Sequence, residues 1–239
     1  MIRTEGTAMH KVERNEAPLE LIQKDKEWKN QLIIDQNLNH DWNKFSKTTL
    51  KKEILKNLKH MYGGCCCYCE GKPGSVSYAE IEHFKPKSIF KELCFDYSNL
   101  HYSCKRCNLA KGNKINSIMF NPIDDDPEDY INYIGEIAVS IDIDELGTEM
   151  IDVLKLNERS DLKEERSKYF SKFTRDFELI VKALQEVDIF TEQSINLIKP
   201  FINEFINVVE CKSKHGESYC TMIKHNFSDK VEMLKEVLL

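Results

Sequence analysis

Apolar residues recur at helical intervals near the start of the chain. Pro18 suits the first turn of a helix, and the segment 18–33 after it repeats every three or four positions through Leu19, Ile22, Trp28, Leu32 and Ile33. A second helix is predicted from Ser46 to Tyr62, where one face carries Leu50, Ile54, Leu58 and Met61. Gly63-Gly64 ends this helix because glycine readily adopts the backbone conformations of a C-cap.

The middle of the chain changes to the alternation that is typical of strands. Residues 76–84 alternate and contain β-branched side chains, which predicts a strand that ends at Lys85-Pro86. A second strand is predicted over 98–103, and a short helix from Arg106 to about Asn113. The predicted order of this segment is therefore strand, strand, short helix.

After two X-Pro breaks, the pattern predicts a hairpin and then helices. The hairpin covers Tyr130 to Ile143 and turns near Gly135. The chain becomes helical from Met150, with a long helix that begins at Ser160. An apolar segment over 195–209 contains Pro200, which predicts a kink or a new start, and a final helix covers about 219–239.

Charge is unevenly distributed along the 239 residues. The net charge is −6, but residues 121–152 hold eleven acidic residues and no Lys or Arg, so without them the chain would carry +5. From His83 to Asn116 there are seven basic residues and two acidic ones. A locally positive segment suits phosphate binding, although an ordinary solvated surface would have the same composition.

The nine cysteines include two Cys-x-x-Cys pairs separated by 34 residues. Such a spacing can bring four thiolates around one tetrahedral zinc ion, with Cys66, Cys69, Cys104 and Cys107 as the ligands. Cys67 is the alternative to Cys66 in the first pair, but two intervening residues let both sulfurs turn inward, which favours Cys66. The others, Cys65, Cys67, Cys94, Cys211 and Cys220, are interpreted as buried thiols. Paired cysteines without a secretory signal favour the cytoplasm, and no apolar run is long enough to span a bilayer.

Between and just after the cysteine pairs lie residues suited to phosphodiester hydrolysis. His83 titrates near neutral pH and can accept a proton from an attacking water. Glu82 and Asn108 offer the oxygen ligands that Mg²⁺ or Mn²⁺ prefers, and Asn99 is expected to bind backbone and fix the loop. Taken alone, a histidine such as His83 in a strand is more often a satisfied core histidine than a base. Candidate phosphate contacts are Lys85, Lys87, Lys105, Lys111 and Lys114.

The order of Glu82-His83, Asn99 and Asn108 around the cysteine pairs resembles the HNH endonuclease motif. The resemblance implies a ββα-metal, treble-clef-like module, with Glu82 and Asn108 as cation ligands and His83 as the base. Two positions depart from the commoner pattern, since Glu82 stands in place of Asp and Asn108 in place of His. The whole chain is then expected to be mostly α-helical with a small α+β module. Its predicted segments are a helical segment 1–62, the HNH module 63–120, an acidic hairpin 121–149 and a helical region 150–239.

The runs CCYCE, EIEHFKPK and NLHYSCKRCNLAKGNK are most similar to the PtuB family, the HNH components of Septu and retron-associated anti-phage systems. That resemblance implies an ABC-type ATPase partner related to PtuA, and in retron systems a reverse transcriptase and its DNA. The motif contacts the phosphate and does not distinguish ribose from deoxyribose, so RNA is an alternative substrate to DNA. A non-catalytic zinc module that binds protein or nucleic acid is the alternative from another class. The helical region 150–239 is predicted to dock the ATPase, unless its phenylalanines form an intramolecular core.

Overall fold

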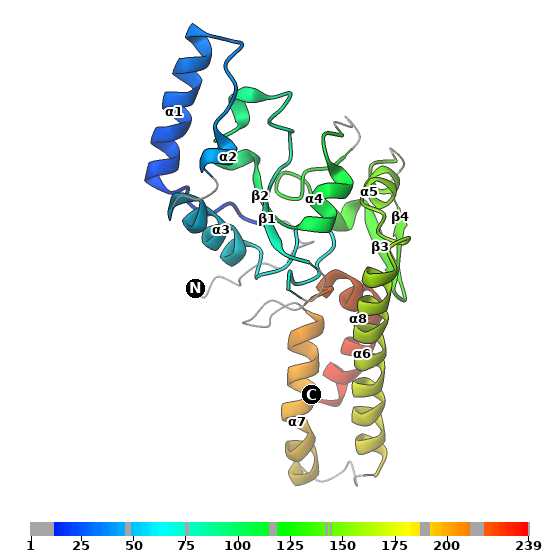
Figure 1. Ribbon diagram of the computed structural model, residues 1–239. Coiled ribbons are helices and arrows are strands. Elements are labelled where there is room, and N and C mark those ends of the chain that lie inside the picture. Colours follow the sequence, from blue (N-terminus) through cyan, green and yellow to red (C-terminus); the bar gives the residue numbers. More distant parts are fainter. Residues whose placement is uncertain are drawn as a thin grey trace.

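The computed structural model of the chain describes residues 12–45, 49–74, 77–114, 119–141, 143, 145–186, 192–210 and 218–238. In Figure 1 the first helices and the first hairpin form an upper lobe, and the last three helices form a lower lobe. The second hairpin and the helix that follows it lie at the side where the two lobes meet. The fold is mostly helical with two small antiparallel hairpins, as predicted.

The first helix, α1 (Leu19–Ile34), forms where it was predicted but buries a different face. Leu21 and Trp28 are its buried residues, whereas Leu19, Ile22 and Ile33 are exposed. Trp28 sets the orientation of the helix, because its ring meets Phe95 edge-on at 5.8 Å and its Nε1 donates to the Lys91 carbonyl at 2.6 Å. An apolar spacing that fits a helix therefore did not identify the side that packs.

The helix α3 (Thr49–Met61) buries the predicted face of Leu50, Ile54, Leu58 and Met61. Residues 46–48, with which the prediction began, lie outside the described residues. A short helix that was not predicted, α2 (Trp42–Phe45), precedes it. Trp42 and Phe45 both pack on Phe95, so α2 joins the core of the upper lobe.

The first hairpin pairs β1 (Ala79–His83) with β2 (Leu100–Cys104), and the helix α4 (Lys105–Lys111) follows directly. Between the strands lie two 3₁₀ turns, η1 (Lys91–Leu93) and η2 (Tyr97–Asn99). The second strand starts two residues later than predicted because the Asp96 side chain accepts from the Ser98 amide and holds residues 97–99 in η2. The predicted order of strand, strand and short helix is confirmed.

The second hairpin pairs β3 (Ile131–Ile134) with β4 (Ile137–Ser140) after the 3₁₀ turn η3 (Pro127–Asp129). Gly135 occupies the turn with φ of 58°, a conformation that glycine adopts at little cost. The helix α5 (Leu146–Leu154) begins before Met150, earlier than predicted.

The lower lobe consists of α6 (Ser160–Glu186), α7 (Glu192–Val209) and α8 (Cys220–Val237). Pro200 lies inside α7, so of the two predicted alternatives, a kink or a new start, the new start is wrong. Phe173, Phe205 and Phe227 form the aromatic core between the three helices. Among the described residues, no helix combines the length and apolar character needed to cross a membrane.

Candidate metal centre and active site

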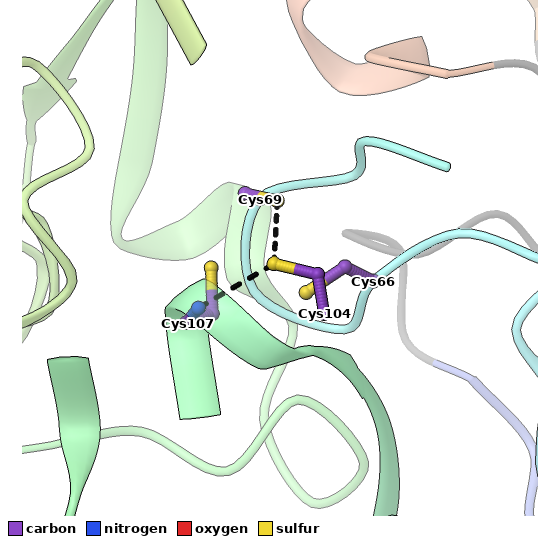
Figure 2. A group of neighbouring side chains, drawn as sticks. All are labelled: Cys66, Cys69, Cys104 and Cys107. Atoms are coloured by element: carbon purple, nitrogen blue, oxygen red, sulfur yellow. Dashed lines mark hydrogen bonds between the residues drawn. The ribbon is translucent and has the colours of Figure 1, made fainter. Parts of the chain in front are cut away.

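Four cysteine side chains from distant parts of the chain converge at one point (Figure 2). The sulfur atoms of Cys66, Cys69, Cys104 and Cys107 all lie within 4.8 Å of one another, and all four residues are buried. Tetrahedral zinc with Zn–S bonds of about 2.3 Å holds its sulfur ligands about 3.8 Å apart. The Cys69 and Cys104 sulfurs, 3.9 Å apart, match that spacing. The predicted ligand set therefore comes together with the dimensions of a structural zinc site.

Backbone hydrogen bonds explain why Cys66, and not Cys67, belongs to the cluster. The Cys66 carbonyl accepts from the Glu70 amide at 3.0 Å, and its amide donates to Gly71 at 3.0 Å, which closes a tight turn around the first pair. The amide of Cys67 instead donates to Tyr102 on β2 at 2.9 Å. Cys104 is the N-cap of α4, and its sulfur accepts from the Cys107 amide at 3.4 Å.

The prediction of buried thiols holds for some of the remaining cysteines and fails for one. Cys65, Cys67 and Cys94 are buried, as predicted. Cys220 is disulfide-bonded, so the prediction of a free thiol is wrong there. Cys211 lies outside the described residues.

Arg159, which the sequence did not single out, supports the cysteine cluster from the next segment of the chain. Its Nη1 donates to the Cys107 sulfur at 3.2 Å, and its Nη2 donates to Asp161 at 3.2 Å. A guanidinium beside a thiolate partly offsets the negative charge that four deprotonated cysteines bring to one ion.

His83, the candidate base, ends β1 and is held in one orientation. Its Nε2 lies 2.9 Å from the Cys94 carbonyl oxygen. A carbonyl can only accept, so Nε2 carries the proton and Nδ1 keeps the lone pair. Burial lowers the pKa of His83 to about 3, although the bond to Cys94 opposes this shift. The ring is therefore neutral at physiological pH with Nδ1 unprotonated, and the expectation that His83 titrates near neutral pH is corrected, because burial disfavours the charged ring.

Asn99 binds the backbone of the loop that follows β1, as expected. Its Oδ1 accepts from the Lys85 amide at 2.8 Å, and its Nδ2 donates to the carbonyls of Lys85 at 2.9 Å and Leu93 at 3.3 Å. The Phe84 amide in turn donates to the Asn99 carbonyl at 3.0 Å. These contacts fix the chain on both sides of the segment that presents Cys94 to His83.

Glu82 and Asn108 lie on the same face of the module, but their side chains bind different partners. The Glu82 carboxylate lies 2.6 Å from the Lys111 ammonium, and Tyr68 donates to it at 3.4 Å. Burial raises the pKa of Glu82 to about 7, against the opposing charge of Lys111. Asn108 instead donates to the Glu80 carboxylate at 2.7 Å. Glu80, at the alternate strand position, is a site residue that the sequence analysis missed.

The alternation of β1 places His83 on the opposite face from Glu80 and Glu82. The described residues hold no cluster of three carboxylate, histidine or cysteine ligands besides the four cysteines. Mg²⁺, however, is usually held by one or two carboxylates with water in its other positions. The carboxylates of Glu80 and Glu82, which contact α4, and the amide oxygen of Asn108 on α4 suit such an ion, with the Lys111 ammonium as a competitor for Glu82.

The candidate phosphate contacts are only partly at the surface. Lys85, Lys105 and Lys114 are exposed, and Lys87 is partly exposed. Lys111 is buried, and besides its pairing with Glu82 it donates to the His83 carbonyl at 3.0 Å. The expectation that Lys111 contacts nucleic acid is therefore corrected, because its charge is used inside the module.

Residues 66–114 match the family model described as HNH endonuclease. The chain is 30% identical over 179 residues to Septu protein PtuB of Bacillus mycoides (strain KBAB4), which covers 61% of this chain and 58% of the relative. It is 31% identical over 150 residues to Septu protein PtuB of Bacillus thuringiensis, covering 62% and 54%. A retron Vc95 putative HNH endonuclease of Vibrio cholerae serotype O1 biovar El Tor is 43% identical over 58 residues, which cover 23% of this chain and 28% of that relative. The chain thus spans little more than half the length of the PtuB relatives.

Proposed function

Residues 66–114 belong to the HNH endonuclease family, and on that premise we propose that the chain is a metal-dependent endonuclease that hydrolyses phosphodiester bonds, with DNA as the favoured substrate. The hydrogen bond between His83 and the Cys94 carbonyl carries the proposal. It gives the histidine the single tautomer in which Nδ1 keeps its lone pair and can accept a proton.

In the proposed reaction, Nδ1 of His83 takes a proton from a water molecule as the water oxygen attacks phosphorus, and the bond from phosphorus to the leaving oxygen breaks. The Cys94 carbonyl then stabilises the imidazolium through its bond to Nε2. Glu82 and Asn108, joined by Glu80, would hold Mg²⁺ or Mn²⁺, which when bound stabilises charge on the phosphate and the leaving oxygen. Because Glu80 and Glu82 lie on the opposite face of β1 from His83, the phosphodiester would have to reach both faces at the end of the strand, where His83 lies. The exposed lysines 85, 87, 105 and 114 would contact flanking phosphates.

A second candidate function is supported by the burial of the same residues. His83 is only 5% exposed, and Glu82 is already paired with Lys111. A zinc module that binds protein or nucleic acid without cleaving it would need neither group to be accessible. An RNA-cleaving enzyme is the third candidate, since the motif contacts phosphate, which DNA and RNA share.

The deciding experiment is a nuclease assay on DNA and RNA, with and without Mg²⁺, comparing wild type with His83→Ala. We expect a loss of about 10²- to 10⁴-fold, the usual contribution of a general base. His60→Ala is the matched control, since His60 is exposed on α3. Glu82→Ala and Asn108→Ala should raise the Mg²⁺ concentration that cleavage requires. Wild-type cleavage by His83→Ala would favour the zinc-module candidate.

We further propose that this nuclease is the effector of a cytoplasmic anti-phage system and works with an ABC-type ATPase. Support comes from the similarity to proteins named Septu PtuB and to a retron putative HNH endonuclease. In a retron setting, a reverse transcriptase and its DNA would be additional partners. The proposed docking surface for the ATPase is an apolar groove of about 560 Å³ between α6 and α7, where Leu179, Leu197 and Phe201 are exposed.

A further inference from the structure

The loop between β1 and β2 is held from outside the HNH segment 66–114 by the N-terminal part of the chain. Arg14 donates from Nη1 to the Leu100 carbonyl at 2.5 Å and from Nη2 to the Ser98 carbonyl at 2.8 Å. These two carbonyls belong to the residues on either side of Asn99. One guanidinium therefore fixes the backbone both before and after the asparagine whose side chain orders the loop.

The stretch that Arg14 binds is connected to the candidate base, His83, in two ways. Leu100 is the residue of β2 that pairs directly with His83. Asn99 donates to the Leu93 carbonyl at 3.3 Å, and the carbonyl of the next residue, Cys94, lies 2.9 Å from Nε2 of His83. A displacement of this stretch would therefore change the distance between the Cys94 carbonyl and the ring.

Arg14 is itself anchored, so it can hold the loop in place. Its Cζ lies 5.2 Å from the centroid of the Tyr97 ring, and the Tyr97 hydroxyl donates to Oδ1 of the neighbouring Asn15 at 2.7 Å. Nδ2 of Asn15 donates to the Asn57 carbonyl on α3 at 3.2 Å. This short N-terminal segment thus connects α3 to the loop that carries Cys94.

An arginine suits this position better than other basic side chains. The guanidinium is planar and stays charged, and its donors point in fixed directions, so it can bind two carbonyl oxygens at once. Hydrogen bonds from a charged donor are also stronger than those between neutral groups. Both bonds of Arg14 go to backbone oxygens, so they act on the path of the chain itself.

We propose that Arg14 is a positioning residue for His83: by binding the carbonyls of Ser98 and Leu100, it keeps the Cys94 carbonyl on Nε2 and so leaves Nδ1 unprotonated. The inference rests on the proposed nuclease function, which it deepens by adding a residue from outside the family match. The hydrogen bond made by one ring nitrogen decides which nitrogen carries the proton. Without the carbonyl at its present distance, the proton would be shared between the two nitrogens.

The activity test compares Arg14→Ala with Glu13→Ala, a change at its exposed neighbour. We expect Arg14→Ala to lower kcat on duplex DNA by up to about 10²-fold, the usual effect of a small misplacement of a reacting group. KM should change little, because Arg14 is expected to act on the base and not on the substrate. Arg14→Lys should recover part of the rate, since an ammonium is a point charge without the fork of donors. Glu13→Ala should match wild type, and an effect of Arg14→Ala on KM alone would overturn the proposal.

The protonation of the His83 ring is measured without substrate, so it separates this inference from the proposed function. Long-range proton–nitrogen NMR spectra distinguish a ring nitrogen that carries a proton from one that keeps its lone pair, and His83→Ala identifies the signals. We expect wild type and Glu13→Ala to hold the proton on Nε2, and Arg14→Ala to share it between the two nitrogens. Arg14→Lys should give an intermediate result, and it is the test variant if Arg14→Ala does not fold.

The two measurements together decide the role of Arg14. If wild type holds the single tautomer and Arg14→Ala loses it, but wild type does not cleave, the nuclease function fails while the positioning role stands. If folded Arg14→Ala, or Arg14→Lys in its place, keeps the wild-type signals of His83, the positioning role is refuted even where cleavage falls.

Discussion

Lys111 and Glu82 form an ion pair inside the module from which water is nearly excluded. Their side chains are 1% and 3% exposed, and their charged atoms lie 2.6 Å apart. Removing one partner of such a pair leaves the other charge buried and unpaired, which typically costs about 3–5 kcal/mol. We expect Lys111→Met to lower the free energy of unfolding by about that amount in urea denaturation.

The control for this prediction is Lys114→Met, an exposed lysine one turn further on, which should change stability little. The double variant Glu82→Gln with Lys111→Met should recover most of the loss, since neither charge then remains. A double variant as unstable as Lys111→Met alone would show that the lysine stem, and not its charge, supports the module.

At the residue scale, the chemistry of the site was easier to predict than the directions of its side chains. The duplicated Cys-x-x-Cys spacing identified all four cysteines of the cluster, because that spacing has few structural meanings. Lys111 looked like one more surface lysine in a basic run. Lys111 is buried because α4 presents Asn108 and then, one turn later, Lys111 to β1. Composition cannot show which residues of a helix face its neighbour.

Two asparagine side chains hydrogen-bond to the backbone of the second hairpin, each with one N–H and one carbonyl group of the same residue. Asn157 accepts from the Ala138 amide at 3.0 Å and donates to the Ala138 carbonyl at 2.7 Å. Asn226 on α8 does the same with Gly135, at 2.8 and 3.0 Å. Ala138 is buried, so its backbone groups would lack partners if the Asn157 side chain were shortened.

We expect Asn157→Ala to cost about 1–3 kcal/mol of stability, the penalty for leaving buried polar groups unsatisfied. Hydrogen exchange should show faster exchange at the Ala138 amide while the amides of α6 stay protected. Asn203→Ala, on the exposed side of α7, is the matched control. If the Ala138 amide of Asn157→Ala exchanges at the wild-type rate, the Asn157 side chain does not hold this part of the hairpin.

Elements formed largely where the sequence predicted them, and their packing was less predictable. The hairpin followed from alternation and from Gly135, both local signals, whereas the hydrogen bonds between Asn157 and Ala138 depend on tertiary structure. Likewise, the pattern of α3 identified its buried face, but that of α1 did not, since Trp28 turns α1 toward Phe95. Local periodicity defines a helix, and only its neighbours decide which side is buried.

The cysteine cluster connects the two lobes of the molecule. Glu70 directly follows Cys69, and its carboxylate accepts from the Thr221 amide and, at 2.7 Å, from the Thr221 hydroxyl at the start of α8. On the other side, Arg159, just before α6, donates to Cys107. These contacts join residues far apart in sequence, so sequence alone could not predict them. Zinc should therefore stabilise the lower lobe as well as the module that holds it.

We expect about one zinc per chain by elemental analysis, and its loss in Cys66→Ser and Cys104→Ser, because a structural zinc supplies folding free energy. Chelation should also speed hydrogen exchange in the first turn of α8. Cys67→Ser is the control, being buried next to Cys66 but outside the cluster. Well-folded protein with less than about half an equivalent of zinc would refute the site.

The apolar groove between α6 and α7 is the part of the lower lobe that the aromatic core leaves uncovered. Phe173 and Phe205 turn inward to Phe227, whereas Phe201 is 69% exposed and Leu197 75% exposed. The predicted intramolecular core is therefore present without Phe201, and Phe173 and Phe205 of that core also line the groove, whose role in docking stays a proposal. Burying one large apolar side chain contributes about 1.5–3 kcal/mol, so Phe201 alone could change the affinity of a partner tenfold or more.

We expect Phe201→Asp to weaken binding of the ABC-type ATPase by at least about tenfold in a titration with the purified subunit, while zinc content and cleavage stay at wild-type levels. Ile34→Asp is the matched control, because Ile34 is 87% exposed on α1 in the upper lobe. If Ile34→Asp loses binding and Phe201→Asp keeps it, the ATPase docks on the upper lobe. Such a result would place the partner on the lobe that also contains β1 and His83 (Figure 1).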